Sequence, residues 1–132
     1  MKETGDMTSK LQFDLVTPET LLLSTQADMV NVPGVEGDFG VMVQHSPLMS
    51  LVRAGVIYVE NDKERLGYFV RGGFANATPS HVTILAEHVL PLKDLTMATL
   101  EAEIKAVRDS AEDSQQAKQD IIDALEAVRP LI

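Results

Sequence analysis

Two carboxylates and a histidine in one glycine-rich stretch are the residues of this sequence best placed to do chemistry. Glu36 and Asp38 alternate with glycines, and His45 follows in the same stretch. Carboxylates and an imidazole can together hold a metal ion or exchange a proton. Three such residues without a recognisable ligand spacing are more often surface groups. The sequence therefore favours a hydrogen-bonding loop role for His45 over a metal or acid–base site.

The backbone around these residues is predicted to form a tight loop with several turns between two strands. Glycines recur at equal intervals at Gly34, Gly37 and Gly40, with Pro33 before the first. Glycine reaches positive φ at little steric cost, and Pro47 breaks the chain again because proline lacks a donor. The spacing differs from the G-x-G-x-x-G pattern and no β-α-β alternation surrounds it, so a dinucleotide-binding fold is excluded.

A second glycine motif, Arg71-Gly72-Gly73, could offer a cation and backbone amides to an anion. The alternative, a glycine bulge where two backbones approach closely, is the more common use of such a pair. The sequence has no G-x-S-x-G elbow, Walker loop or H-E-x-x-H motif, and it has no cysteine. We therefore expect no catalytic residues, no metal site and no cofactor.

Composition limits the classes of partner. The chain has 132 residues, which suits one compact domain or a domain with an appendage. Its net charge of −9 argues against nucleic acid and anionic lipid as direct partners. The apolar runs are shorter than the roughly 20 residues of a bilayer span, and the first ten residues lack the apolar segment of a signal peptide. Any membrane association is expected to occur through protein partners, without direct lipid insertion.

The alternation of apolar and polar residues predicts an antiparallel β-sandwich over residues 1–91. Many short strands separated by glycine and proline turns are typical of a sandwich or barrel. Strands are expected where the alternation or the β-forming residues are clearest. They are 11–16, 21–23, 30–32, 41–43, 55–60, 65–70, 74–77 and 82–85.

The period changes after Pro91, and residues 92–132 are predicted to form an antiparallel hairpin of two helices. Asp94 or Thr96 can cap the first helix, in which Glu101 and Lys105 are spaced for an ion pair. Ser114 can cap the second helix, and Pro130 ends it. The apolar stripes of the two helices are Leu100, Ile104, Val107 and Ala111, then Ile121, Leu125 and Val128.

In combination these motifs resemble the signature of the epsilon subunits of F-type ATP synthases, whose mitochondrial counterpart is called delta. The resemblance covers Pro-Gly at 33–34, Glu-Gly-Asp-Phe-Gly at 36–40, His-Ser-Pro-Leu at 45–48 and Gly55. It also includes residues 11–20, 72–74 and 82–86. It spans most of residues 8–93, whereas the tail matches only in kind.

The resemblance implies a non-catalytic subunit of the central rotor. In this family the sandwich packs on the gamma subunit and stands on the c-subunit ring, on the cytoplasmic face of the bacterial plasma membrane. It thereby helps to transmit ring rotation, driven by proton flow, to the catalytic head. The matching ring-facing positions are Glu36, Gly37, Asp38 and His45. The positions that shape this loop are Pro33, Gly34, Gly40 and Pro47.

The tail departs from the regulatory pattern of the family. In many bacterial members the helices reach the alpha and beta subunits of the catalytic head and inhibit hydrolysis. Some bind ATP through an Ile/Leu-Asp-x-x-Arg-Ala motif. Here Thr96 and Thr99 replace the aspartate and arginine, and residues 94–132 have nine acids against four bases. We therefore expect no nucleotide site and at most weak inhibition.

A different class of protein is also compatible with the sequence, namely a free-standing β-sandwich binding module with a helical dimerisation hairpin. It would behave as a self-sufficient monomer or homodimer, whereas a rotor subunit would co-purify with a large membrane-attached complex.

Overall fold

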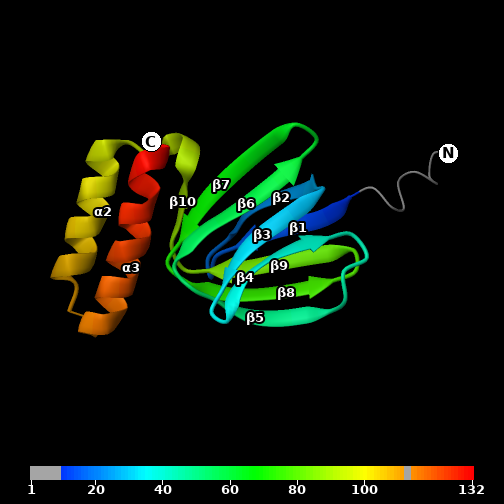
Figure 1. Cartoon of the computed structure of the whole chain (residues 1–132), viewed down its shortest axis with the longest axis horizontal. Helices are drawn as coiled ribbons and strands as arrows, with labels where there is room; N and C mark the ends of the chain where they lie inside the picture. Colours follow the sequence, from blue (N-terminus) through cyan, green and yellow to red (C-terminus); the bar gives the residue numbers. More distant parts are fainter. Residues whose placement is uncertain (1–9, 112–113) are drawn as a thin grey trace.

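The computed structural model describes residues 10–111 and 114–132 and confirms a β-sandwich followed by helices (Figure 1). The ten strands of the described chain share apolar–polar alternation or short β-forming runs. They are β1 (Leu11–Val16), β2 (Leu21–Ala27), β3 (Met29–Gly34), β4 (Gly37–Met42), β5 (Leu48–Val52), β6 (Gly55–Asn61), β7 (Glu64–Val70), β8 (Gly73–Thr78), β9 (His81–Ala86) and β10 (Val89–Pro91).

The strands form one sheet that curls over on itself. The order is β10-β7-β6-β3-β5-β8-β9-β1-β2, and β4 pairs with β3 off this path. The strand pairs of this sheet are antiparallel, as expected, except that β1 and β9 pair in parallel, with Phe13 opposite Val82. The expectation of a wholly antiparallel sandwich is therefore wrong at this one position among the described strands.

The inward-facing residues of this curled sheet form a closed apolar core. In β1, Leu11, Phe13 and Leu15 are fully buried while the alternate residues are half-buried. The buried residues of this core come from β1 to β9 and include none from the helices. Each large apolar side chain removed from water contributes about 1.5–3 kcal/mol, so this core is a major source of the sandwich's stability.

Two helices lie side by side against one flank of the sandwich, next to β6, β7 and β10 (Figure 1). They are α2 (Met97–Asp109) and α3 (Gln115–Val128), preceded and followed by the short 3₁₀ helices η1 (Leu92–Asp94) and η2 (Arg129–Leu131). Their stripes meet Phe69 of β7 in a second apolar core. Thr96 caps α2 and Ser114 caps α3, as expected, since each side-chain oxygen accepts a backbone N–H of the first turn.

Some local expectations about these elements are wrong. Val43 lies in a turn because β4 ends at Met42, and Ala111 is exposed beyond the end of α2. The expected ion pair between Glu101 and Lys105 does not form, because Lys105 pairs with Asp109 at 2.7 Å. Strand β10 was not predicted, since three residues are too few to show a period.

Within the described residues no helix is both long and apolar enough to cross a membrane.

Candidate functional site

The acidic stretch forms a β-hairpin with a two-residue turn rather than a loop with several turns. Val35 and Glu36 form the turn, and β4 begins immediately afterwards with Gly37 opposite Gly34. Gly37 has a φ of +136°, and a Cβ on Gly34 would lie 2.6 Å from the Gly37 carbonyl oxygen. The glycines are therefore needed to close a tight turn between paired strands.

Other positions expected to shape the loop serve the strands. Pro33 lies in β3 opposite Asp38, and Gly40 lies in β4 opposite Asn31. Pro47 is exposed in the connection just before β5. Glycine and proline usually mark turns, which is why the sequence predicts turns at all three positions, but β3 continues through Pro33 and β4 continues through Gly40.

The two acids of the turn have different electrostatic surroundings. Both side chains are exposed, and Asp38 forms an ion pair with Arg53, which follows β5. Among the described residues no cation lies within 4 Å of Glu36. Glu36 is therefore the unneutralised carboxylate at the tip of the hairpin, and it is free to pair with a partner's cation.

His45 lies away from this acidic turn. It follows the opposite end of β4, and about 17 Å of extended strand separates Gly37 from Met42. The backbone N–H of Gln44 donates to the Pro79 carbonyl at 2.6 Å, which places this segment beside the β8–β9 turn. His45 is half-buried, and its Nδ1 lies 2.6 Å from the Ser46 carbonyl oxygen. This agrees with the hydrogen-bonding loop role that the sequence favours. The expected proximity of His45 to Glu36 and Asp38 is not found.

The Arg71-Gly72-Gly73 segment is occupied by contacts within the protein. A Cβ on Gly73 would lie 2.1 Å from the Leu85 carbonyl oxygen, so the glycine allows β8 and β9 to approach closely. Arg71 Nη2 donates to Glu103 Oε1 of α2 at 3.2 Å. These contacts favour the close-packing alternative over an anion site.

An exposed line of apolar side chains crosses the outer face of five adjacent strands. Successive residues stand directly opposite one another in the sheet register, so their side chains are neighbours on one face. This apolar row consists of Leu51 (β5), Phe74 (β8), Leu85 (β9), Val16 (β1) and Leu21 (β2). Leu51, Leu85 and Leu21 are 59%, 44% and 55% exposed. A contiguous exposed apolar surface of this kind marks an interaction site.

A polar cluster lies beside the apolar row on the same face. Ser24 Oγ donates to Asp14 Oδ1 at 2.7 Å, and His81 Nε2 lies 2.9 Å from Asp14 Oδ2. These hydrogen bonds, from Ser24 first and then His81, hold the pKa of the Asp14 carboxyl below its ordinary value. The row is therefore bordered by an ordered polar rim, as in other protein interfaces.

The family described as ATP synthase, Delta/Epsilon chain, beta-sandwich domain matches residues 10–92. Relatives called ATP synthase epsilon chain extend the match into the tail. That of Parvibaculum lavamentivorans is 48% identical over 129 residues, covering 93% of this chain and 98% of the relative. That of Paramagnetospirillum magneticum is 43% identical over 110 residues, covering 83% of each chain.

This chain belongs to the ATP synthase delta/epsilon family. Family membership makes it a structural rather than a catalytic subunit, in agreement with the expectation from sequence. The fold also matches a chain in the mitochondrial ATP synthase of Euglena gracilis, a structure of OSCP, F1 and the c-ring. That match has a TM-score of 0.76 and 17% identity, and covers 99% of this chain and 86% of the other.

In this delta/epsilon chain the two threonines at the ATP-motif positions have structural roles. Thr96 Oγ1 accepts the Thr99 backbone N–H at 3.1 Å and lies 3.0 Å from Thr99 Oγ1. Arg129, directly after α3, donates to Glu126 of α3 and to Glu101 of α2 at 2.8 Å each, and the bond to Glu101 joins the two helices. Sequence reasoning missed both the Glu101–Arg129 pair and the apolar row, since each depends on a register between distant segments.

Proposed function

We propose that this protein is the rotor subunit that links the c-ring and the gamma subunit in the central stalk of a proton-translocating F-type ATP synthase. It performs no chemistry itself. Its closed, densely packed β-core suits a torque-bearing connection, because close-packed interiors have low compressibility. The function also agrees with the family match and with the identity to epsilon chains.

The apolar row is the observation that supports this proposal most strongly, and we assign it to the gamma contact. Leu51, Leu85 and Leu21 of the row are each 44% exposed or more and adjoin one another through Phe74 and Val16, so a partner is needed to remove this surface from water. The polar cluster around Asp14 would then lie at the rim of the gamma interface.

The Glu36 tip is assigned to the polar loops of the c-ring, together with Gly37 and Asp38. Glu36 is exposed and unneutralised, and the Asp38–Arg53 pair beside it gives the tip a defined shape. Charges on such a rim steer association and fix register. The protein would then be peripheral, on the cytoplasmic face of the bacterial plasma membrane, and held there by its partners. His45 is at the other end of β4 and is not part of this contact.

The alternative of a free-standing module that dimerises through its hairpin receives less support. The stripes of both helices are already buried against each other and against Phe69. A hairpin dimer would therefore first have to expose this second core. The apolar row needs no such rearrangement to meet a partner, because it is already exposed.

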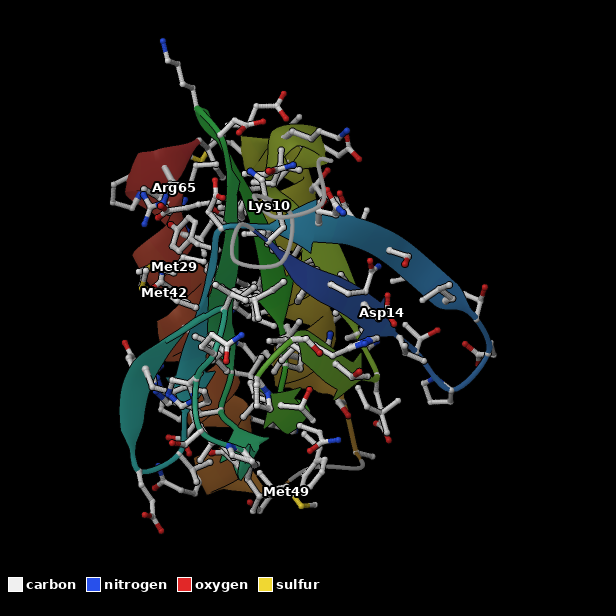
Figure 2. The ribbon with its side chains drawn as sticks, turned by 90° about the vertical axis from the view of Figure 1, so that its right-hand side faces the viewer. Lys10, Asp14, Met29, Met42, Met49 and Arg65 are labelled. Carbon is white, nitrogen blue, oxygen red and sulfur yellow. The ribbon has the colours of Figure 1, made fainter. Side chains whose placement is uncertain are left out.

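The row is tested by binding of the isolated protein to purified gamma subunit. Leu51→Lys places a charge in the row, and we expect it to weaken binding at least about tenfold, because a charge would be desolvated in an apolar interface. Met42→Lys is the matched control, since Met42 is similarly exposed on β4 and lies on the opposite side of the molecule from Asp14 (Figure 2). Equal gamma affinity of the two folded variants would refute the assignment.

The tip is tested by assembly with the c-ring. We expect Glu36→Lys combined with Asp38→Lys to reduce recovery of the assembled complex, and to do so more at low salt, since the contact is electrostatic. The isolated variant should remain folded, because both side chains are exposed. Unchanged recovery at low and high salt would exclude the tip as a ring contact.

A further inference from the structure

A hollow of about 330 Å³ opens beside the apolar row, where β8 and β9 meet the turn after β1. Pro18, Phe74 and Leu85 form its apolar wall, and Arg71 and Glu87 provide its charged wall. Phe74 and Leu85 also belong to the apolar row, so the hollow continues the proposed gamma surface. Interfaces of this kind gain much of their affinity from a few side chains that enter such pockets.

The Arg71 side chain both lines the hollow and forms an ion pair with the helical hairpin. Its side chain lines the hollow, and its guanidinium donates to Glu103 of α2 at 3.2 Å. The Arg71 and Glu103 side chains are only 22% and 24% exposed, so this pair is less screened than the surface pairs of the hairpin. Among the described residues it is the only ion pair between the sandwich and the hairpin.

We propose that the hollow receives an apolar side chain of the gamma subunit, and that Arg71 couples this contact to the docking of the helical hairpin on the sandwich. The inference rests on the proposed gamma contact and adds to it an anchoring pocket and a link to the tail. Glu103 holds the guanidinium in place as a wall of the hollow. A hairpin that leaves the sandwich removes Glu103, frees Arg71 and loosens the wall that faces gamma.

Coupling of this kind is reciprocal. If hairpin docking strengthens the gamma contact, then gamma must stabilise the docked hairpin by the same factor. Other charged contacts of the hairpin, such as Arg129 with Glu101, lie within the hairpin and do not reach the hollow. They should have no such effect, which provides an internal control.

The coupling is tested by titrating purified gamma subunit into variants of the full chain. We expect Glu103→Gln to weaken gamma binding about threefold to tenfold, although Glu103 does not line the hollow. Glu101→Gln, which breaks the Arg129 pair on the same helix, should bind gamma like the unmodified protein. In hydrogen exchange, gamma should protect α2 in the unmodified protein and less so in Glu103→Gln.

The pocket is tested with two exposed prolines. Pro18→Ala removes part of the apolar wall and should weaken gamma binding about threefold or more. Pro47→Ala, before β5 and outside the row, should leave binding unchanged. Equal affinities of the two proline variants would overturn the pocket, and equal affinities of the Glu103 and Glu101 variants would overturn the coupling. If Leu51→Lys still weakens binding in that case, the proposed function stands; if it does not, the gamma assignment itself fails.

Discussion

The ionised form of the Asp14 carboxylate is stabilised by hydrogen bonds from side chains on three strands. It accepts hydrogen bonds from Ser24 of β2 and His81 of β9, and from Gln12 on its own strand. These bonds favour the ionised form and lower the pKa of the Asp14 carboxyl. Because the group is more acidic in the folded than in the unfolded chain, its ionisation is linked to stability.

We predict that Asp14→Asn lowers the free energy of unfolding by about 1 kcal/mol at neutral pH, since hydrogen bonds to a charged acceptor are lost. A lowered folded pKa contributes stability that is complete above the unfolded value, near pH 4, and disappears as the pH falls through the folded value. The difference between the two proteins should therefore shrink below about pH 4. Denaturant unfolding at pH 7 and at pH 3 measures it, and a constant difference would contradict the prediction.

Residue-level predictions from sequence succeed where the partner is local. Thr96 could be recognised as a cap because the N–H that it accepts, that of Thr99, lies three residues away. The partner of Asp38, Arg53, lies 15 residues away and is brought near by the β3–β5 register. No spacing rule identifies such a pair, so the sequence could indicate an acidic turn but not which acid remains free.

At the scale of elements, the strands and the helices bury their apolar faces in two separate cores. The sandwich core contains no helical residue, whereas the hairpin core depends on Phe69 and on half-buried neighbours such as Val56 and Leu90. Removing the hairpin should therefore expose one face of β6 and β7 without opening the sandwich. We propose a boundary between the two modules near Leu92, with the sandwich over 1–91 and the hairpin over 92–132.

We predict that a chain ending at Leu92 keeps its β-structure and unfolds cooperatively at a lower temperature. Exposure of Phe69 removes roughly 1.5–3 kcal/mol of burial, which is a large part of a typical domain's stability but less than all of it. Circular dichroism during thermal unfolding measures this. The same truncation with Phe69→Thr controls for aggregation through the uncovered face. Loss of β-structure in both truncated proteins would show that the two modules fold as one.

Elements were predictable from sequence to the extent that each shows its own period. Alternation in β1 and the stripe of α3 are properties of a single segment, and both were located correctly. The parallel pairing of β1 with β9 joins segments about 70 residues apart, and no local pattern encodes it. The apolar row is a product of this pairing, which explains why it was absent from the sequence-based prediction.

At the scale of the whole molecule, the tail is acidic and most of its bases are already engaged. Of its four bases, Lys105 pairs with Asp109, Lys118 donates to the Arg108 carbonyl, and Arg129 bridges Glu101 and Glu126. Hydrogen bonds with Glu126 and Glu101 raise the pKa of Arg129 above its ordinary value. Few cations are therefore available for a phosphate group or for an acidic surface of the catalytic head.

From this charge distribution we predict that the protein does not bind ATP at physiological concentration and that its tail is at most a weak brake on hydrolysis. An ATP site needs cations for the phosphates, because charge-assisted hydrogen bonds supply much of the binding. Thr96 and Thr99 instead form hydrogen bonds with each other at the start of α2. The net charge of −5 over residues 94–132 also repels a polyanion. Calorimetric titration of the isolated protein with ATP measures the first part, and saturable binding below about 1 mM, or about −4 kcal/mol, would contradict it.

The weak effect of the tail on hydrolysis is measured by comparing hydrolysis rates of the assembled enzyme with and without residues 94–132. Removal of the tail should change the rate less than about fivefold, because an exposed pair between the tail and the head contributes at most about 1 kcal/mol. A larger rise would show that this acidic helical hairpin inhibits through contacts other than charge.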